Sequence, residues 1–76
     1  MRYEILKYER IRNLRIDNNL TQKEIADLLG VKQNTYSQYE IGKISYPIDA
    51  LPILAKFYNV STDYLLGLTN EMKPYN

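Results

Sequence analysis

The stretch LTQKEIADLLGVKQNTYSQYEIGK, residues 20–43, predicts two short helices joined by a tight turn. Thr21, with Glu24 three residues later, matches a capping box, in which each side chain binds the backbone N–H of the other residue. Gly30 follows where a left-handed residue commonly ends a helix, and Gly42 marks the end of the second helix. The apolar residues of the first helix recur at helical spacing and form one face: Ile25, Leu28 and Leu29.

The second helix carries a polar face that is poor material for a protein core. Every residue of that face can form hydrogen bonds and only one is charged: Lys32, Gln33, Asn34, Ser37 and Gln38. A side-chain amide offers a donor and an acceptor side by side, which matches the adenine edge in the DNA major groove. Tyr36 and Tyr39 share another face, and we expect both in the core rather than as platforms for stacking bases.

The chain resembles the phage-repressor and Cro-like family of helix-turn-helix regulators, also called the xenobiotic-response-element family. The resemblance covers roughly residues 7–67 and rests on these segments: Leu20-Thr21-Gln22, Ile25-Ala26, Leu29-Gly30-Val31, Thr35-Tyr36-Ser37, Glu40-Ile41-Gly42-Lys43, residues 54–61 and Asp63-Tyr64-Leu65-Leu66-Gly67. It implies an all-α, compact five-helix lambda-repressor-like domain, with a helix-turn-helix formed by its second and third helices. The helices are expected at about 4–18, 22–29, 32–41, 50–58 and 62–66.

We expect the domain to span residues 1–68, with a polar, loosely held tail over residues 69–76. Residues 1–6 precede the family's usual first helix and are either an arm that reaches DNA or a segment packed on the body through Ile5 and Leu6. The inner stripe of the first helix is Tyr8, Ile11 and Leu14. Asp49 and Ser61 are suited to cap the last two helices, and Leu51, Leu54, Ala55 and Tyr58 should close the core.

The resemblance implies that the third helix enters the major groove of DNA. Its base-reading residues would be Gln33, Asn34, Ser37 and Gln38, with a preference for A·T pairs because the face is rich in amides. Contacts to the DNA backbone would come from Gln22, Lys32 and Lys43, with Ser45 and Tyr46 as weaker candidates. The family usually has Ser or Thr at the position of Lys32. A lysine there loses a hydroxyl cap and meets the positive helix end, and a DNA phosphate would relieve that repulsion.

Two structural roles also follow from the resemblance. Arg15 would pair with Glu40 and tie the first helix to the end of the third; the alternative is a solvated arginine on a charged face. Ala26 corresponds to the small residue that lets the second and third helices cross closely.

Composition limits the other classes of function. The chain has 76 residues, of which 45% are hydrophobic, and is long enough for one small domain. It has neither Cys nor His, and Gly42-Lys43 lacks the other residues of a P-loop, so we expect no enzyme, cofactor or metal site. No stretch approaches the ~20 apolar residues of a membrane span, and we expect a cytoplasmic protein. The net charge of +1 gives nucleic-acid binding no support by itself.

The expected partner is double-stranded DNA with a near-palindromic operator, bound by a homodimer that regulates transcription, as a repressor would. Tyr64 and Leu68 either form the dimer contact or complete the monomer core. The alternative is a protein-interaction module or an antitoxin-type partner protein with the same fold. Eight tyrosines keep this alternative open, because Tyr is enriched at protein interfaces.

Overall fold

The computed structural model describes residues 9–73, and within this range the chain forms five helices and no strand. The helices are α2 (Glu9–Asp17), α3 (Gln22–Leu29), α4 (Gln33–Glu40), α5 (Ala50–Tyr58) and α6 (Thr62–Leu65). The predicted all-α fold class is confirmed. The expected start of the first helix near residue 4 or 7, the stripe position Tyr8 and the packing of Ile5 and Leu6 lie outside the described residues.

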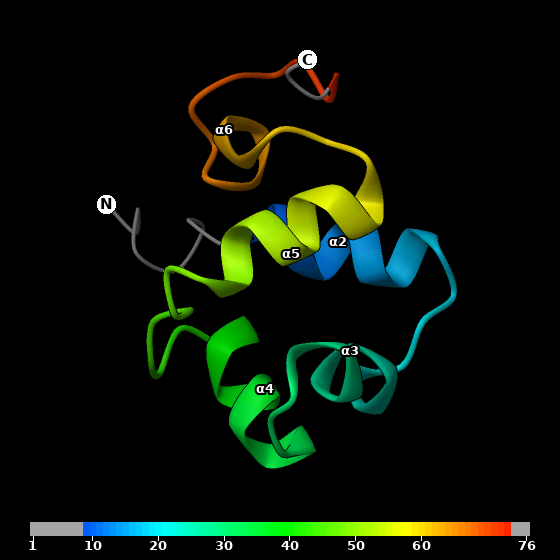
Figure 1. Cartoon of the computed structure of the whole chain (residues 1–76), viewed down its shortest axis with the longest axis vertical. Helices are drawn as coiled ribbons and strands as arrows, with labels where there is room; N and C mark the ends of the chain where they lie inside the picture. Colours follow the sequence, from blue (N-terminus) through cyan, green and yellow to red (C-terminus); the bar gives the residue numbers. More distant parts are fainter. Residues whose placement is uncertain (1–8, 74–76) are drawn as a thin grey trace.

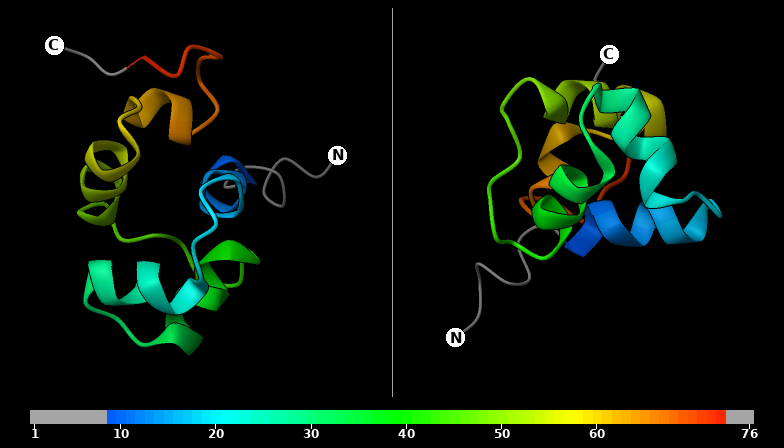
Figure 2. Two further views of the ribbon diagram at one scale, coloured as in Figure 1. Left: turned by 90° about the vertical axis from the view of Figure 1, so that its right-hand side faces the viewer. Right: turned by 90° about the horizontal axis from the view of Figure 1, so that it is seen from below.

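The two helices of the opening stretch form one end of the molecule. In Figure 1, α3 and α4 lie together at the bottom, and α6 lies at the top with the segment that follows it. The 90° turn in Figure 2 shows the same order, with α2 and α5 on opposite sides between the two ends. None of the helices within residues 9–73 has both the length and the apolar character needed to cross a membrane.

Local interactions explain why α3 begins and ends where it does. The Glu24 N–H donates to Thr21 Oγ1 at 3.1 Å, and the Thr21 N–H donates to Glu24 Oε1 at 2.7 Å, so the predicted capping box is confirmed. Gly30 has φ 72°, a left-handed conformation in which a side chain would be strained. The N–H groups of Gly30 and Val31 then donate to the carbonyls of Asp27 and Ala26, which turns the chain sharply toward α4.

The predictions for the caps and bounds of the other helices are only partly correct. The Ser61 side chain caps α6 by accepting from the Tyr64 N–H at 3.0 Å, as predicted. Asp49 precedes α5, but its side chain makes no capping hydrogen bond, so that prediction is wrong. The reason is its backbone, which is already helical at φ −71° and ψ −19°, whereas a capping side chain requires an extended backbone. Helix α4 is one residue shorter at each end than predicted.

The core lies between α2, α3, α4, α5 and α6, each of which contributes at least one buried side chain. Tyr36 is completely buried and Tyr39 nearly so, which confirms both as core residues. Tyr46 is also buried, and the centre of its ring lies 5.0 Å from the centre of the Tyr39 ring. Its expected role as a weak contact to the DNA backbone is therefore wrong. The loop after α4 folds back so that this aromatic ring gains burial among other tyrosines.

Contacts from α2 hold part of the segment that follows α6. The Arg10 guanidinium lies 4.4 Å from the centre of the Tyr64 ring and also donates to the Thr69 carbonyl and, at 2.6 Å, to Asn70 Oδ1. The Ser61 N–H donates to the Met72 carbonyl at 3.3 Å. Residues 69–72, expected to be loosely held, are thus bound to α2 and to the start of α6.

Candidate nucleic-acid interface

The polar face of α4 is accessible and its side chains are free to bind a ligand. Gln33 and Asn34 are exposed, while Ser37 and Gln38 are half-buried along the same helix. None of these four side chains forms a hydrogen bond with another residue in the range 9–73. Because α4 lies at one end of the molecule (Figure 1), its polar face can approach a large partner.

The exposed charged side chains next to this face lie at the two ends of α4. The only charged residue within α4 is Glu40, which is buried, so the exposed part of the helix is neutral. Lys32 stands exposed before the first turn of α4, where its side chain makes no capping bond. Lys43 is exposed just after the helix, and its N–H donates to the Gln38 carbonyl at 2.9 Å. Two cations thus flank a row of neutral amides.

Behind the polar face, the Glu40 carboxylate joins three helices. Arg15 of α2 donates to it twice, from Nε to Oε2 at 2.7 Å and from Nη2 to Oε1 at 3.2 Å. The Tyr36 hydroxyl of α4 donates to Oε2 at 2.6 Å, and Gln22 Nε2 of α3 donates to Oε1 at 3.0 Å. We call these four residues the Glu40 cluster. The Glu40 side chain is only 2% exposed, so its negative charge depends on these donors.

The sequence indicated only half of this cluster. The Arg15–Glu40 pair was expected from the family resemblance, and the structure contains it. The bonds from Tyr36 and Gln22 were not anticipated. Tyr36 and Glu40 are four residues apart on one helix, a spacing that brings side chains together and was the available signal. Gln22, for which a phosphate contact is expected, directs one amide hydrogen to Glu40.

The protonation states within the cluster follow from burial and hydrogen bonding. Burial alone would raise the pKa of Glu40, but the hydrogen bonds from Arg15, Tyr36 and Gln22 outweigh it and hold the pKa below its ordinary value. The hydrogen bond to Glu40 raises the pKa of Arg15. Burial raises the pKa of Tyr36, so its hydroxyl stays protonated and acts as a donor. The cluster is therefore an ionised, internally balanced unit at neutral pH.

The lowered pKa of Glu40 predicts a loss of stability in acid. A carboxyl group whose pKa is lower in the folded state stabilises the protein above its unfolded pKa, and this contribution is lost as the pH falls through the folded value. The free energy of unfolding, measured by urea titration, should therefore fall as the pH drops below the ordinary glutamate value of about 4.3. The fall should be shallower in Tyr36→Phe, which removes one bond to the carboxylate. An equal fall in both proteins would contradict this assignment.

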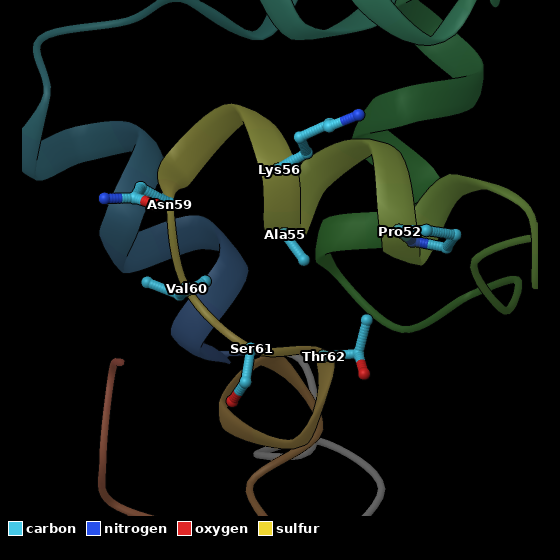
Figure 3. Close-up of a pocket in the computed structure, with 7 residues that line it drawn as sticks. All are labelled: Pro52, Ala55, Lys56, Asn59, Val60, Ser61 and Thr62. Atoms are coloured by element: carbon cyan, nitrogen blue, oxygen red, sulfur yellow. The ribbon is translucent and has the colours of Figure 1, made fainter. Parts of the chain in front are cut away.

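A hollow of about 370 Å³ lies away from α4, between α5 and the turn into α6 (Figure 3). Figure 3 shows Ala55 and Thr62 on its facing sides, with the Lys56 side chain directed away from Thr62. The Ser61 hydroxyl on its wall already accepts from the Tyr64 N–H. Within residues 9–73, no three acidic side chains gather as a metal site would require. The hollow and the acidic side chains of the described residues are therefore weaker candidates for a functional site than the polar face of α4.

Two short helices crossing at a glycine turn, with the second exposing amides between flanking cations, define a helix-turn-helix protein of the DNA-binding class. The family model described as "Helix-turn-helix" matches residues 11–65, most of the chain. The chain belongs to this family, in its phage-repressor and Cro-like branch.

Proteins similar in sequence to this chain include transcriptional regulators, which is consistent with the family. The chain is 41% identical over 66 residues to the uncharacterized HTH-type transcriptional regulator YobD of Bacillus subtilis, a match that covers 87% of this chain and 59% of that protein. It is 45% identical over 51 residues to the cryptic phage CTXphi transcriptional repressor RstR of Vibrio cholerae, covering 67% and 46%. Antitoxin PezA of Streptococcus pneumoniae is 33% identical over 64 residues, covering 84% and 40%. The chain thus spans about half the length of these relatives.

Proposed function

We propose that the chain binds double-stranded DNA with sequence specificity and regulates transcription in the cytoplasm, as a repressor would. The observation that carries the proposal is the row of four polar side chains on α4 that have no partner within the described residues. Unpaired amides on an exposed helix suit the base edges of the major groove. Gln33, Asn34, Ser37 and Gln38 would read bases, and contacts to A·T pairs would predominate.

Contacts to the DNA backbone would position this helix. Lys32 and Lys43 lie at the two ends of α4, so each can meet a phosphate beside the groove that the helix occupies. The missing side-chain cap at Lys32 supports this role, since a phosphate would offset its unfavourable place at the positive end of the helix. Gln22, at the start of α3, is the third backbone contact.

Lys43→Ala should weaken binding to all DNA sequences by similar factors. The substitution removes one phosphate contact, so the slope of log affinity against log salt should become shallower by about 1. Fluorescence anisotropy with a labelled duplex at several salt concentrations measures both quantities. Lys73→Ala is the matched control, because it removes the same charge from the segment that follows α6, and this segment lies at the end of the molecule opposite α4 (Figure 1). A loss confined to one base-pair change would show that Lys43 reads sequence instead.

We further propose that the protein binds as a homodimer to a near-palindromic site, with half-sites about 34 Å apart. Leu68 is 72% exposed, which suits a contact between subunits. Tyr64 packs against the core and carries Arg10 over its ring, so most of its surface is used within the monomer. The dimer contact would therefore involve Leu68 more than Tyr64.

The alternative, a protein-interaction or antitoxin-type role, is supported by the likeness to a relative named as an antitoxin. Selection from random double-stranded DNA, at low and then moderate salt, separates the two functions. Enrichment of a palindrome supports sequence reading by a dimer, and enrichment of a single half-site supports sequence reading without a stable dimer. Failure to enrich any sequence at either salt concentration would overturn the proposed function in favour of a protein partner.

A further inference from the structure

The position of the Gln22 amide suggests that it is oriented from within the protein. Gln22 is the first residue of α3, directly after the cap at Thr21, and its side chain is half-buried. A glutamine amide has two N–H donors, and the bond to Glu40 Oε1 uses one of them. The second donor has no partner within residues 9–73. One amide hydrogen is thus fixed and the other is available to an acceptor outside the chain.

The orientation of that amide depends on how the Glu40 carboxylate is held. Oε2 accepts from Arg15 Nε and from the Tyr36 hydroxyl, while Oε1 accepts from Arg15 Nη2 and from Gln22. Tyr36 is completely buried and lies on the same helix as Glu40, so its ring cannot follow a rotating carboxylate. The short bond from its hydroxyl therefore fixes the carboxylate plane and, with it, the acceptor that Gln22 uses.

The charge balance of the cluster also suits a phosphate nearby. Glu40 would repel an approaching phosphate if its charge were uncompensated, but the Arg15 guanidinium lies against it at 2.7 Å. Gln22 then presents a neutral donor in front of an ion pair without net charge. A phosphate can accept from the free amide hydrogen without meeting an unbalanced anion.

We propose that Tyr36 is a positioning residue for DNA binding, which acts through Glu40 to hold the Gln22 amide with its free N–H toward the phosphate backbone. The inference rests on the proposed function and deepens it. Tyr36 does not touch DNA, and its role is exerted on α3 from the interior of the protein. Its hydroxyl links the helix that reads bases to the helix end that meets the backbone.

The first test observes the amide in the free protein by NMR. The Gln22 side-chain NH₂ signals are identified by their absence in Gln22→Ala. In the wild type they should show restricted motion, and in Tyr36→Phe they should shift and become mobile. Tyr39→Phe is the matched control: Tyr39 is a buried tyrosine of the same helix, and its hydroxyl forms no hydrogen bond with another described residue. Unchanged Gln22 signals in Tyr36→Phe would overturn the proposal.

The second test measures coupling between Tyr36 and Gln22 in operator binding. Tyr36→Phe and Gln22→Ala should each lower affinity by about 3- to 10-fold, and Tyr36→Phe should have almost no further effect in the Gln22→Ala background. Urea unfolding of each variant measures its free energy of unfolding, which gives the fraction of the protein that is folded in the binding assay. Additive losses, or lowered stability with unchanged affinity, would make Tyr36 a structural residue only. A wild-type protein that selects no sequence would overturn the proposed function as well.

Discussion

Arg15→Ala should lower the free energy of unfolding by about 3–5 kcal/mol, the usual cost of removing one partner of a buried ion pair. The variant leaves the Glu40 carboxylate, whose side chain is 2% exposed, without a counterion inside the protein. It also removes the bond from Arg15 Nη1 to the Leu20 carbonyl, which holds the loop before α3. In a domain of this size such a loss consumes most of the stability.

Urea denaturation followed by circular dichroism measures this loss. Arg12→Ala is the matched control, because Arg12 is an exposed arginine on the same helix and its removal should change stability by less than about 0.5 kcal/mol. The double variant Arg15→Met with Glu40→Met should recover part of the stability, since no buried charge remains. Recovery would be incomplete, because the Tyr36 hydroxyl then loses its acceptor. If Arg15→Ala lowered the free energy of unfolding by less than about 1 kcal/mol, the Arg15–Glu40 pair would contribute no more than a solvent-exposed ion pair does.

Gln38→Ala should weaken operator binding by about 1–3 kcal/mol and relax the preference at one base pair. Gln38 lies on the polar face of α4, and its side chain has no partner within the described residues. The substitution leaves the backbone carbonyl that accepts from the Lys43 and Ile44 N–H groups unchanged. The folded structure should therefore persist, and the loss should come from the missing base contact.

A set of operators, each with one base pair changed, measures this effect by competition binding. Asn13→Ala supplies the control, because it removes an exposed amide from α2 rather than from α4. The variant should bind the wild-type operator more weakly yet tolerate changes at one position that the wild-type protein rejects. Equal weakening on every sequence would identify Gln38 as a backbone contact.

The helix-turn-helix was predictable because its signals are local. The capping box at Thr21 and the left-handed Gly30 are fixed by neighbouring residues, and the apolar spacing of α3 requires no knowledge of the rest of the chain. The polar face of α4 was predictable for the same reason. Helical periodicity alone separates its amides from the buried Tyr36 and Tyr39.

The features that sequence reasoning missed depend on contacts between distant segments. Tyr46 lies within the loop between α4 and α5, directly before Pro47, and only the path of that loop decides whether its ring meets solvent or the other tyrosines. Asp49 has the right residue type for a cap, but the preceding turn gives it a helical backbone. Arg10 reaches residues about sixty positions away in the sequence, and Gln22 meets Glu40 only because α3 crosses α4. Local patterns carry no signal for such partners.

The central claim is that α4 reads adenines in the major groove through its amides. The most direct measurement is binding to the selected operator with 7-deazaadenine replacing one adenine at a time, which removes the N7 acceptor while leaving base pairing intact. We predict that replacing particular adenines lowers the affinity of the operator for the wild-type protein. At one of these adenines, the replacement should leave the affinity for Gln38→Ala unchanged. Unchanged affinity at every adenine would contradict major-groove reading by α4.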